Sequence, residues 1–143
     1  MPYIKIWLHC VWNTKGKQTL LTKDIRQKLF RHFFEYSKTK NIFIDRINGS
    51  IEHIHCLISL GGDQSISKVI NYLKGESSHW INKQKLTSNK FEWQDDYFAV
   101  SVSESVVDKV RKYIDNQEEH HKKISFKDEY ETFIKKYGFK YLG

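Results

Sequence analysis

The order in which strand-like and helix-like periodicities follow one another is the feature that most constrains the fold of this chain. In residues 3–12, apolar side chains recur at every second position, which is typical of a strand with two distinct faces. In residues 22–40 the spacing becomes helical, with Leu29 and Phe33 on one stripe and Thr22 as the expected N-cap. A helix therefore follows the first strand.

Two further β-rich runs come next, IFIDRI and SIEHIHCLISL. They are separated by Asn48-Gly49, a dipeptide that readily adopts the positive φ angles of a tight hairpin. The second and third strands are therefore expected to form an antiparallel pair that ends at Gly61-Gly62.

Four more elements complete the pattern. They are a helix over residues 66–81, a strand over residues 97–103, a helix that begins at Ser103 or Ser105 and runs to about His121, and an amphipathic helix over residues 126–137 that ends at Gly138. The order β-α-β-β-α-β folds naturally as a split βαβ sheet, ferredoxin-like or RRM-like, with the two early helices on one face. We therefore expect an α+β fold with an antiparallel sheet, in one domain over residues 1–143, whose other face remains for function.

Composition narrows the class of protein. Lys and Arg outnumber Asp and Glu by 24 to 17, and a net charge of +7 attracts polyanions, so nucleic acid is the first partner to consider. A solvated basic surface explains the same excess equally well. No segment approaches the roughly 18 apolar residues of a membrane span. Cys10 and Cys56 alternate within apolar runs, as buried free thiols do. We expect a cytoplasmic protein.

His53 and His55 lie two residues apart in the predicted third strand, so their side chains project from the same face. The residues on the opposite face, Ile54, Cys56 and Ile58, are core-like. The two imidazoles are thus expected to point away from the core and to be able to converge on one metal ion. An ordinary polar face of a sheet is the alternative interpretation of the same pair.

Tyr113 and Gln117 are four residues apart in the predicted third helix and so share one face. A phenol is thereby paired with a neutral oxygen ligand. Alternatively, Tyr113 is an aromatic residue at the edge of the core, because Val110 lies on nearly the same side of the helix. His120 and His121 extend this face as extra ligands, phosphate contacts or plain exposed residues, and we favour exposure for both.

Five segments taken together resemble the HUH single-tyrosine nucleases. They are WNTKGKQTLL, EHIHCLISL, LKGESSHWIN, FEWQDDYFAVSVSES and KVRKYIDNQEEHH, which span nearly the whole chain. Within that family the chain is most similar to the small transposases of simple bacterial insertion sequences and their repeat-associated relatives. Each segment is a weak signal alone, and the combination is specific.

The resemblance implies a function and a site. Tyr113 corresponds to the nucleophile, and His53, His55 and Gln117 correspond to the ligands of a divalent ion, Mg²⁺ or Mn²⁺. The implied activity is metal-dependent cleavage and transfer of single-stranded DNA through a 5′-phosphotyrosine, beside hairpins at the ends of a mobile element. Two neutral imidazoles and an amide would leave most of the ion's charge available to the phosphate. The sequence does not identify a general base.

Substrate contacts are predicted at Lys15, Lys17, Arg46 and Lys74, which occupy turns or helix surfaces where they can reach phosphates, although each also fits ordinary surface charge. Three alternatives stay open: a domesticated nuclease acting on chromosomal repeats, a non-enzymatic RRM-like module and a structural zinc site. The third predicted strand lacks the aromatic run with which an RRM reads bases. Zinc sites usually need four ligands, often Cys, whereas both Cys face the predicted core.

A homodimer is expected, with sites that combine the histidines of one subunit with the tyrosine helix of the other. The physical reason is an apolar row at Tyr3, Trp7 and Val11 on the less buried side of the first strand, which a monomer would expose. The resemblance implies the sharing of sites.

Overall fold

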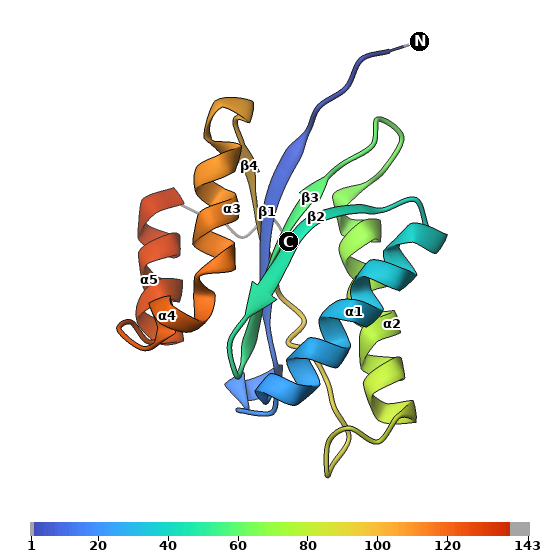
Figure 1. Cartoon of the computed structure of the whole chain (residues 1–143), viewed down its shortest axis with the longest axis vertical. Coiled ribbons are helices and arrows are strands. Elements are labelled where there is room, and N and C mark those ends of the chain that lie inside the picture. Colours follow the sequence, from blue (N-terminus) through green and yellow to red (C-terminus); the bar gives the residue numbers. More distant parts are fainter. Residues whose placement is uncertain (1, 138–143) are drawn as a thin grey trace.

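A computed structural model describes residues 2–137, in which four strands form one antiparallel sheet in the order β2-β3-β1-β4. The strands are β1 (Trp7–Asn13), β2 (Phe43–Gly49), β3 (His53–Ser59) and β4 (Phe98–Val102). The long helices α1 (Lys23–Thr39) and α2 (Ile66–Lys83) cover one face of the sheet (Figure 1). The α+β, ferredoxin-like class expected from the sequence is confirmed.

Three shorter helices cover the other face of the sheet: α3 (Val107–Asp115), α4 (Gln117–His121) and α5 (Phe126–Tyr137) (Figure 1). Two single 3₁₀ turns, η1 (Lys15–Lys17) and η2 (Glu104–Val106), follow β1 and β4. The expected third helix is therefore broken at Asn116, and its continuation is the separate helix α4. The predicted end of the last helix, Gly138, lies outside the described residues.

The main core lies between the sheet and the pair α1 and α2. Alternate strand residues meet the buried stripes of the two helices there, and the largest contributors include Trp12, Phe33, Leu29, Ile54, Ile58, Ile70, Leu73 and Ile81. Burial of each such aliphatic or aromatic side chain stabilises the fold by roughly 1.5–3 kcal/mol. Thr22 caps α1 as expected, because its Oγ1 accepts a hydrogen bond from the Ile25 amide at 3.4 Å.

A smaller apolar cluster lies on the opposite face and attaches α3 to the sheet. It consists of Trp7 and Leu57 from the strands, with Val107 and Ile114 from α3. Trp7 is 5% exposed and Val11 3% exposed, so the row predicted to form a dimer interface is buried by the chain's own helices. Only Tyr3 of that row is exposed, because β1 begins at Trp7 and not at residue 3.

The hairpin between β2 and β3 also differs from the expected tight turn. Gly49 stays in the β-ladder opposite Ile54, and the connection is made by residues 50–52. A Cβ atom on Gly49 would lie 2.2 Å from the carbonyl oxygen of His53, so the glycine is needed for this close approach and not for a positive φ. The Asn48 side chain instead donates to the carbonyls of Ile114 and Asp115 at the end of α3.

Within residues 2–137, no helix is long and apolar enough to cross a bilayer.

Candidate metal and tyrosine site

Histidines from two adjacent strands form the floor of a buried site beneath α3, α4 and α5. His53 and His55 are fully buried on β3, on the face opposite the main core, as the two-residue spacing predicts. His9, from β1, lies beside them, with its Nε2 2.8 Å from Nδ1 of His55. Three imidazoles therefore meet on the face that the early helices leave free.

Hydrogen bonds turn the two β3 imidazoles toward the same point. Nδ1 of His53 lies 2.7 Å from Oε1 of Glu52, and Nδ1 of His55 is occupied by His9. The Nε2 atoms of His53 and His55 consequently both face Oε1 of Glu129, at 3.6 Å and 2.8 Å. An imidazole whose second nitrogen is held by a carboxylate or another polar group is the usual arrangement of a metal ligand.

Tyr113 and Gln117 reach this point from α3 and the start of α4. Gln117 is fully buried, and its Oε1 lies 3.3 Å from Nε2 of His53. The hydroxyl of Tyr113 donates a short hydrogen bond to Oε2 of Glu129. The ring centres of Tyr113 and His55 are 5.6 Å apart. All four site residues predicted from the sequence therefore lie together within one chain.

Glu129 on α5 is the centre of the arrangement. Its Oε2 lies 2.8 Å from Nε2 of His120 and 3.2 Å from Nε2 of His121. The ligand atoms of His53, His55, His121 and Glu129, here called the His-Glu cluster, all lie within 4.8 Å of one another. Our preference for exposed His120 and His121 was therefore wrong, because α5 folds back and places its carboxylate against both rings.

The donor set of the His-Glu cluster fits a divalent ion. The buried Nε2 of His121 makes no hydrogen bond within residues 2–137, so its lone pair or its proton lacks a well-aligned partner. One carboxylate and several imidazoles supply the nitrogen and oxygen ligands typical of transition-metal and Mn²⁺ sites. The cluster could therefore hold a metal ion.

Burial determines the protonation states of His55 and His9. It lowers the pKa of His55 to about 3 and that of His9 to about 4, so both rings are neutral near neutral pH, as metal ligation requires. Burial alone would raise the pKa of Glu129. The contacts with His121 and His55 and the hydrogen bond from Tyr113 outweigh burial, and they hold that pKa well below the ordinary range of a carboxyl. Glu129 is therefore ionised.

The basic side chains predicted to contact DNA have different environments. Lys15 and Arg46 remain accessible. Nζ of Lys15 lies 3.2 Å from a carboxylate oxygen of Glu92, and Nη1 of Arg46 lies 3.2 Å from one of Asp45. The ammonium of Lys17 lies 4.9 Å from the centre of the Tyr130 ring. Lys74 is buried, and its Nζ donates to the backbone carbonyls of residues 94–96 at 2.5–3.3 Å. All three donors of that ammonium are thus engaged, so Lys74 is not placed to contact a phosphate.

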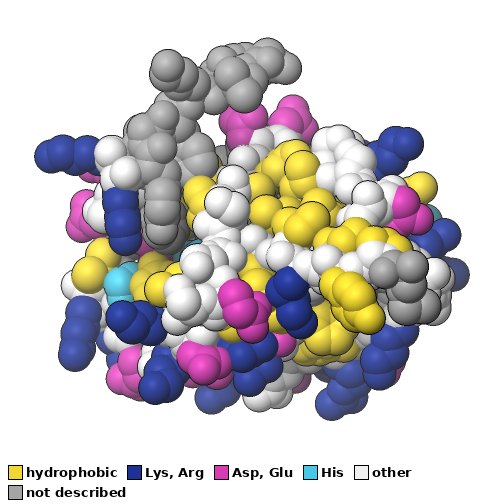
Figure 2. Space-filling view, turned by 90° about the horizontal axis from the view of Figure 1, so that it is seen from above, with side chains coloured by type: hydrophobic (Ala, Val, Ile, Leu, Met, Phe, Trp, Pro, Cys, Tyr) yellow, Lys and Arg dark blue, Asp and Glu magenta, His cyan; other side chains and the backbone are white. Residues whose placement is uncertain are grey.

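On one face of the molecule the positive charge is dispersed. Figure 2 shows Lys and Arg side chains mainly around the margin of one face, interspersed with Asp and Glu, with hydrophobic side chains near its centre. The net charge of +7 is therefore not gathered into a single basic patch on that face.

Comparisons with known proteins agree on the family of this chain. The sequence profile described as "Transposase IS200 like" matches residues 3–117. The ISDra2 transposase TnpA of Deinococcus radiodurans is 24% identical over 115 residues, which cover 76% of this chain and 81% of the relative.

Two solved structures have the same fold. A protein of Deinococcus radiodurans described as a transposase has a TM-score of 0.66 and 19% identity, over 81% of this chain and 93% of its own. A REP-associated tyrosine transposase bound to a REP hairpin has a TM-score of 0.61 and 18% identity, over 86% of this chain and 71% of its own. Because the profile covers most of the sequence, this chain belongs to the IS200-like transposase family.

Proposed function

We propose that this chain is a transposase that cuts single-stranded DNA with Tyr113 and rejoins it, in the cytoplasm, to mobilise an insertion sequence. The observation that carries the proposal is the convergence at Glu129. The Tyr113 hydroxyl and the Nε2 atoms of His53 and His55 all face the carboxylate of this one residue. A nucleophile and candidate ligands for a cation thus share one small buried volume, which is what phosphodiester cleavage by a tyrosine needs.

The reaction follows from the chemistry of a phenol. The Tyr113 oxygen attacks the phosphorus of a phosphodiester, and the bond from phosphorus to the 3′-oxygen breaks. The phenol gives up its proton as it attacks, and the departing 3′-oxygen takes up a proton to become a 3′-hydroxyl, while the other strand stays attached as a 5′-phosphotyrosine. Attack by a 3′-hydroxyl on that linkage reverses the step, so the same site can join strands without a separate energy source.

Glu129 orients the phenol in this scheme. Its Oε2 accepts the Tyr113 hydrogen bond, which fixes the direction of the hydroxyl. A carboxylate with so low a pKa is a weak proton acceptor, so we assign Glu129 to positioning and not to removal of the Tyr113 proton.

The proposed cation ligands are His53, His55 and Gln117, with Glu129 and His121 available as further ligands. Mg²⁺ or Mn²⁺, when bound, would neutralise the charge that develops on the non-bridging phosphate oxygens. The protein's own contribution is to keep the His55 imidazole neutral by burial and to hold the Nε2 atoms of His53 and His55 toward one point.

For the substrate we propose single-stranded DNA next to a hairpin at the end of the element. Support comes from the net positive charge and from the REP-associated relative, whose structure contains a REP hairpin. Lys15, Lys17 and Arg46 are the proposed phosphate contacts. An RRM-like module is disfavoured, because the central strands carry histidines under helices on the face where an RRM exposes aromatic rings.

Covalent attachment tests the proposal directly. Single-stranded DNA of random sequence flanked by hairpins is incubated with protein and Mn²⁺ or Mg²⁺, and the products are separated under denaturing conditions. DNA labelled at its 3′ end should label the protein, whereas DNA labelled at its 5′ end should release a free fragment.

The Tyr113→Phe variant should lose the labelled band, because only the hydroxyl is removed, and Tyr72→Phe serves as the exposed tyrosine control. His53→Ala should lose it as well. An adduct on Tyr97 or Tyr130, or one formed equally well with chelator, contradicts the assignment.

A further inference from the structure

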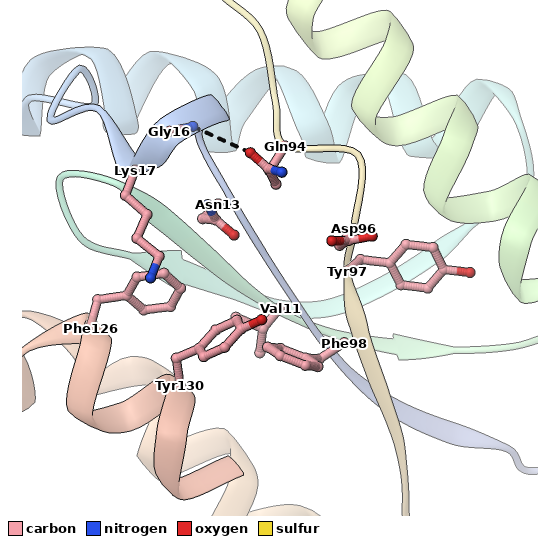
Figure 3. Close-up of a pocket in the computed structure, with 10 residues that line it drawn as sticks. All are labelled: Val11, Asn13, Gly16, Lys17, Gln94, Asp96, Tyr97, Phe98, Phe126 and Tyr130. Atoms are coloured by element: carbon pink, nitrogen blue, oxygen red, sulfur yellow. Dashed lines mark hydrogen bonds between the residues drawn. The ribbon is translucent and has the colours of Figure 1, made fainter. Parts of the chain in front are cut away.

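A pocket of about 330 Å³ adjoins the site, and of its lining only Lys17 has a role in the proposed function (Figure 3). It is called here the aromatic pocket, and it is lined by Val11, Asn13, Gly16, Lys17, Gln94, Asp96, Tyr97, Phe98, Phe126 and Tyr130. Phe126 forms a wall shared with the site, because its ring stacks on His53 at 4.2 Å between centres. Asn13 is paired with His53 across β1 and β3. A group bound in this pocket would therefore lie next to the strand being cut.

One side of the aromatic pocket is built from rings. Phe98 of β4 and Tyr130 of α5 lie 4.9 Å apart between ring centres, and Figure 3 shows both rings on the same side of the pocket as Phe126. The Lys17 ammonium lies 5.8 Å from the centre of Phe126 and points down toward it. Such a wall offers faces on which a flat, weakly polar group can stack.

The other side of the pocket is polar and presents hydrogen-bonding groups. Asn13 uses its Nδ2 on the carbonyl of Thr14, and Gln94 uses its Oε1 on the amide of Gly16. Oδ1 of Asn13 and Nε2 of Gln94 have no hydrogen-bond partner among residues 2–137. The Asp96 carboxylate accepts no hydrogen bond from a side chain in that range, and the nearby Lys74 ammonium, which donates to the Asp96 backbone carbonyl at 3.3 Å, interacts with it electrostatically. In Figure 3, Asn13 and Asp96 lie between Gln94 and the rings. The pocket thus combines stacking faces with both donors and acceptors.

We propose that the aromatic pocket binds one unpaired nucleobase of the DNA strand, beside the bond that Tyr113 cleaves. This inference rests on the proposed function, because it takes single-stranded DNA as the substrate. A nucleobase has the two features that the lining matches, a flat face and an edge of N–H and C=O groups. A phosphate does not fit the polar side of the pocket, because the Asp96 carboxylate would repel it, whereas Lys17, which also lines the pocket, remains the proposed contact of a backbone phosphate.

Asp96 also gives the pocket a preference among bases. A carboxylate accepts two parallel N–H bonds, and guanine presents two such donors side by side on its pairing edge. Adenine and cytosine present one amino group beside an acceptor, and thymine flanks its single N–H with two carbonyls. Guanine is therefore the base that the pocket binds best.

Binding to defined oligonucleotides tests this inference without cleavage. The Tyr113→Phe protein is titrated with short oligothymidylates that carry one central guanine, adenine, cytosine or abasic nucleotide, and affinity is measured by fluorescence anisotropy. The guanine strand should bind roughly five-fold or more tightly than the abasic strand, as expected for loss of one stacked base.

Two sets of variants in the Tyr113→Phe background, one aromatic and one acidic, locate the effect. Phe98→Ala and Tyr130→Ala should each remove the advantage of guanine over the abasic nucleotide, whereas Tyr72→Ala, an exposed aromatic of α2, should keep it. Asp96→Asn should reduce the preference for guanine over adenine, whereas Asp63→Asn should not. Thermal unfolding of each variant separates a loss of binding from a loss of folding.

The proposal is overturned if the abasic and guanine strands bind equally, or if the folded Phe98→Ala and Tyr130→Ala proteins match Tyr72→Ala. Binding of none of the strands overturns it too. These outcomes are distinct from a failure of the proposed function, which is measured by the covalent band of the cleaving protein. If the cleaving protein forms the covalent band but shows no preference among bases, the proposed cleavage stands and only the proposed base binding in the aromatic pocket is refuted.

Discussion

At the scale of single residues, Glu129 determines the charge of the site. It is 4% exposed and lies within contact distance of four imidazole nitrogens and the Tyr113 hydroxyl. An ionised carboxylate buried to this degree is stabilised only by such partners, and without them it would become protonated. Glu129 is therefore the residue that connects the histidines of the strands, the histidines of α4 and Tyr113.

Replacement of Glu129 by Gln preserves its shape and removes its charge. We expect the affinity for Mn²⁺ to fall about 10- to 100-fold, in the range seen when groups that support a metal site are altered. Isothermal titration with Mn²⁺ measures the effect. Glu131→Gln is the matched control, because that side chain is exposed on the same helix. Equal Mn²⁺ affinity of the two variants would show that Glu129 is not part of the cation site.

The buried histidines predict an acid-sensitive fold. Burial lowers the pKa of His9 to about 4 from an ordinary value of 6.5, so between these values the unfolded chain takes up a proton that the folded chain excludes. In the presence of chelator, the free energy of unfolding should therefore decrease as pH falls from about 6.5 toward 4. Below the ordinary carboxyl pKa, protonation of Glu129 adds to the loss, because its folded pKa is depressed.

Urea denaturation at a series of pH values measures this slope. His9→Gln should show a shallower decrease, because one buried titrating ring has been removed. A slope identical to that of the unaltered protein would mean that His9 is not held neutral by the fold.

Some site residues could be predicted from the sequence and others could not. His53 with His55, and Tyr113 with Gln117, are close in sequence, so the periodicity of one strand or one helix is enough to place each pair on a common face. Glu129 has no such signal. Its neighbours Asp128 and Glu131 are equally acidic, and only the packing of α5 on the sheet decides which carboxylate is buried.

At the scale of elements, the hairpin between β2 and β3 connects the floor of the site to α3. Asn48, expected to form a turn, instead binds the last carbonyls of α3 at 2.9 Å and 3.1 Å. The turn dipeptide was misassigned because its alternative partner lies 66 residues away along the chain, beyond any local pattern. The strand and helix order was predicted correctly, because each long element carries its own apolar periodicity.

The close approach at Gly49 gives a stability prediction. Gly49→Ala should lower the free energy of unfolding by about 2 kcal/mol, because the added methyl group would collide with the His53 backbone. Gly75→Ala is the matched control. Its Cβ would meet nothing within 4 Å inside α2, so that variant should be stabilised by about 0.5–1 kcal/mol. Chemical denaturation compares the two, and similar midpoints would contradict the contact at Gly49.

At the scale of the whole molecule, a homodimer remains our prediction, although its apolar row at Trp7 and Val11 is buried within the chain. We expect a mixture of His53→Ala and Tyr113→Phe proteins to recover the covalent band. Exchange of strands between two sites would require the attached tyrosine to move from one site to the other. If the sites are shared between subunits, the heterodimer contains one site with both the intact histidines and the intact tyrosine.

Affinity tags of two kinds verify that the heterodimer has formed before the band is scored. A heterodimer without a band would show that each chain works with its own residues. That result would correspond to the arrangement in which Tyr113 lies beside its own His55.

Because Glu129 accepts a hydrogen bond from Tyr113, a cation bound to the same carboxylate would compete with the Tyr113 hydroxyl for it. Such competition is reciprocal: if a bound cation weakens the hydrogen bond by a given factor, loss of the hydrogen bond raises the affinity of Glu129 for the cation by the same factor. A tyrosine esterified by DNA has no hydrogen left to donate. If Tyr113 becomes attached to DNA as proposed, the His-Glu cluster would therefore bind a cation more tightly in the attached state than in the free protein.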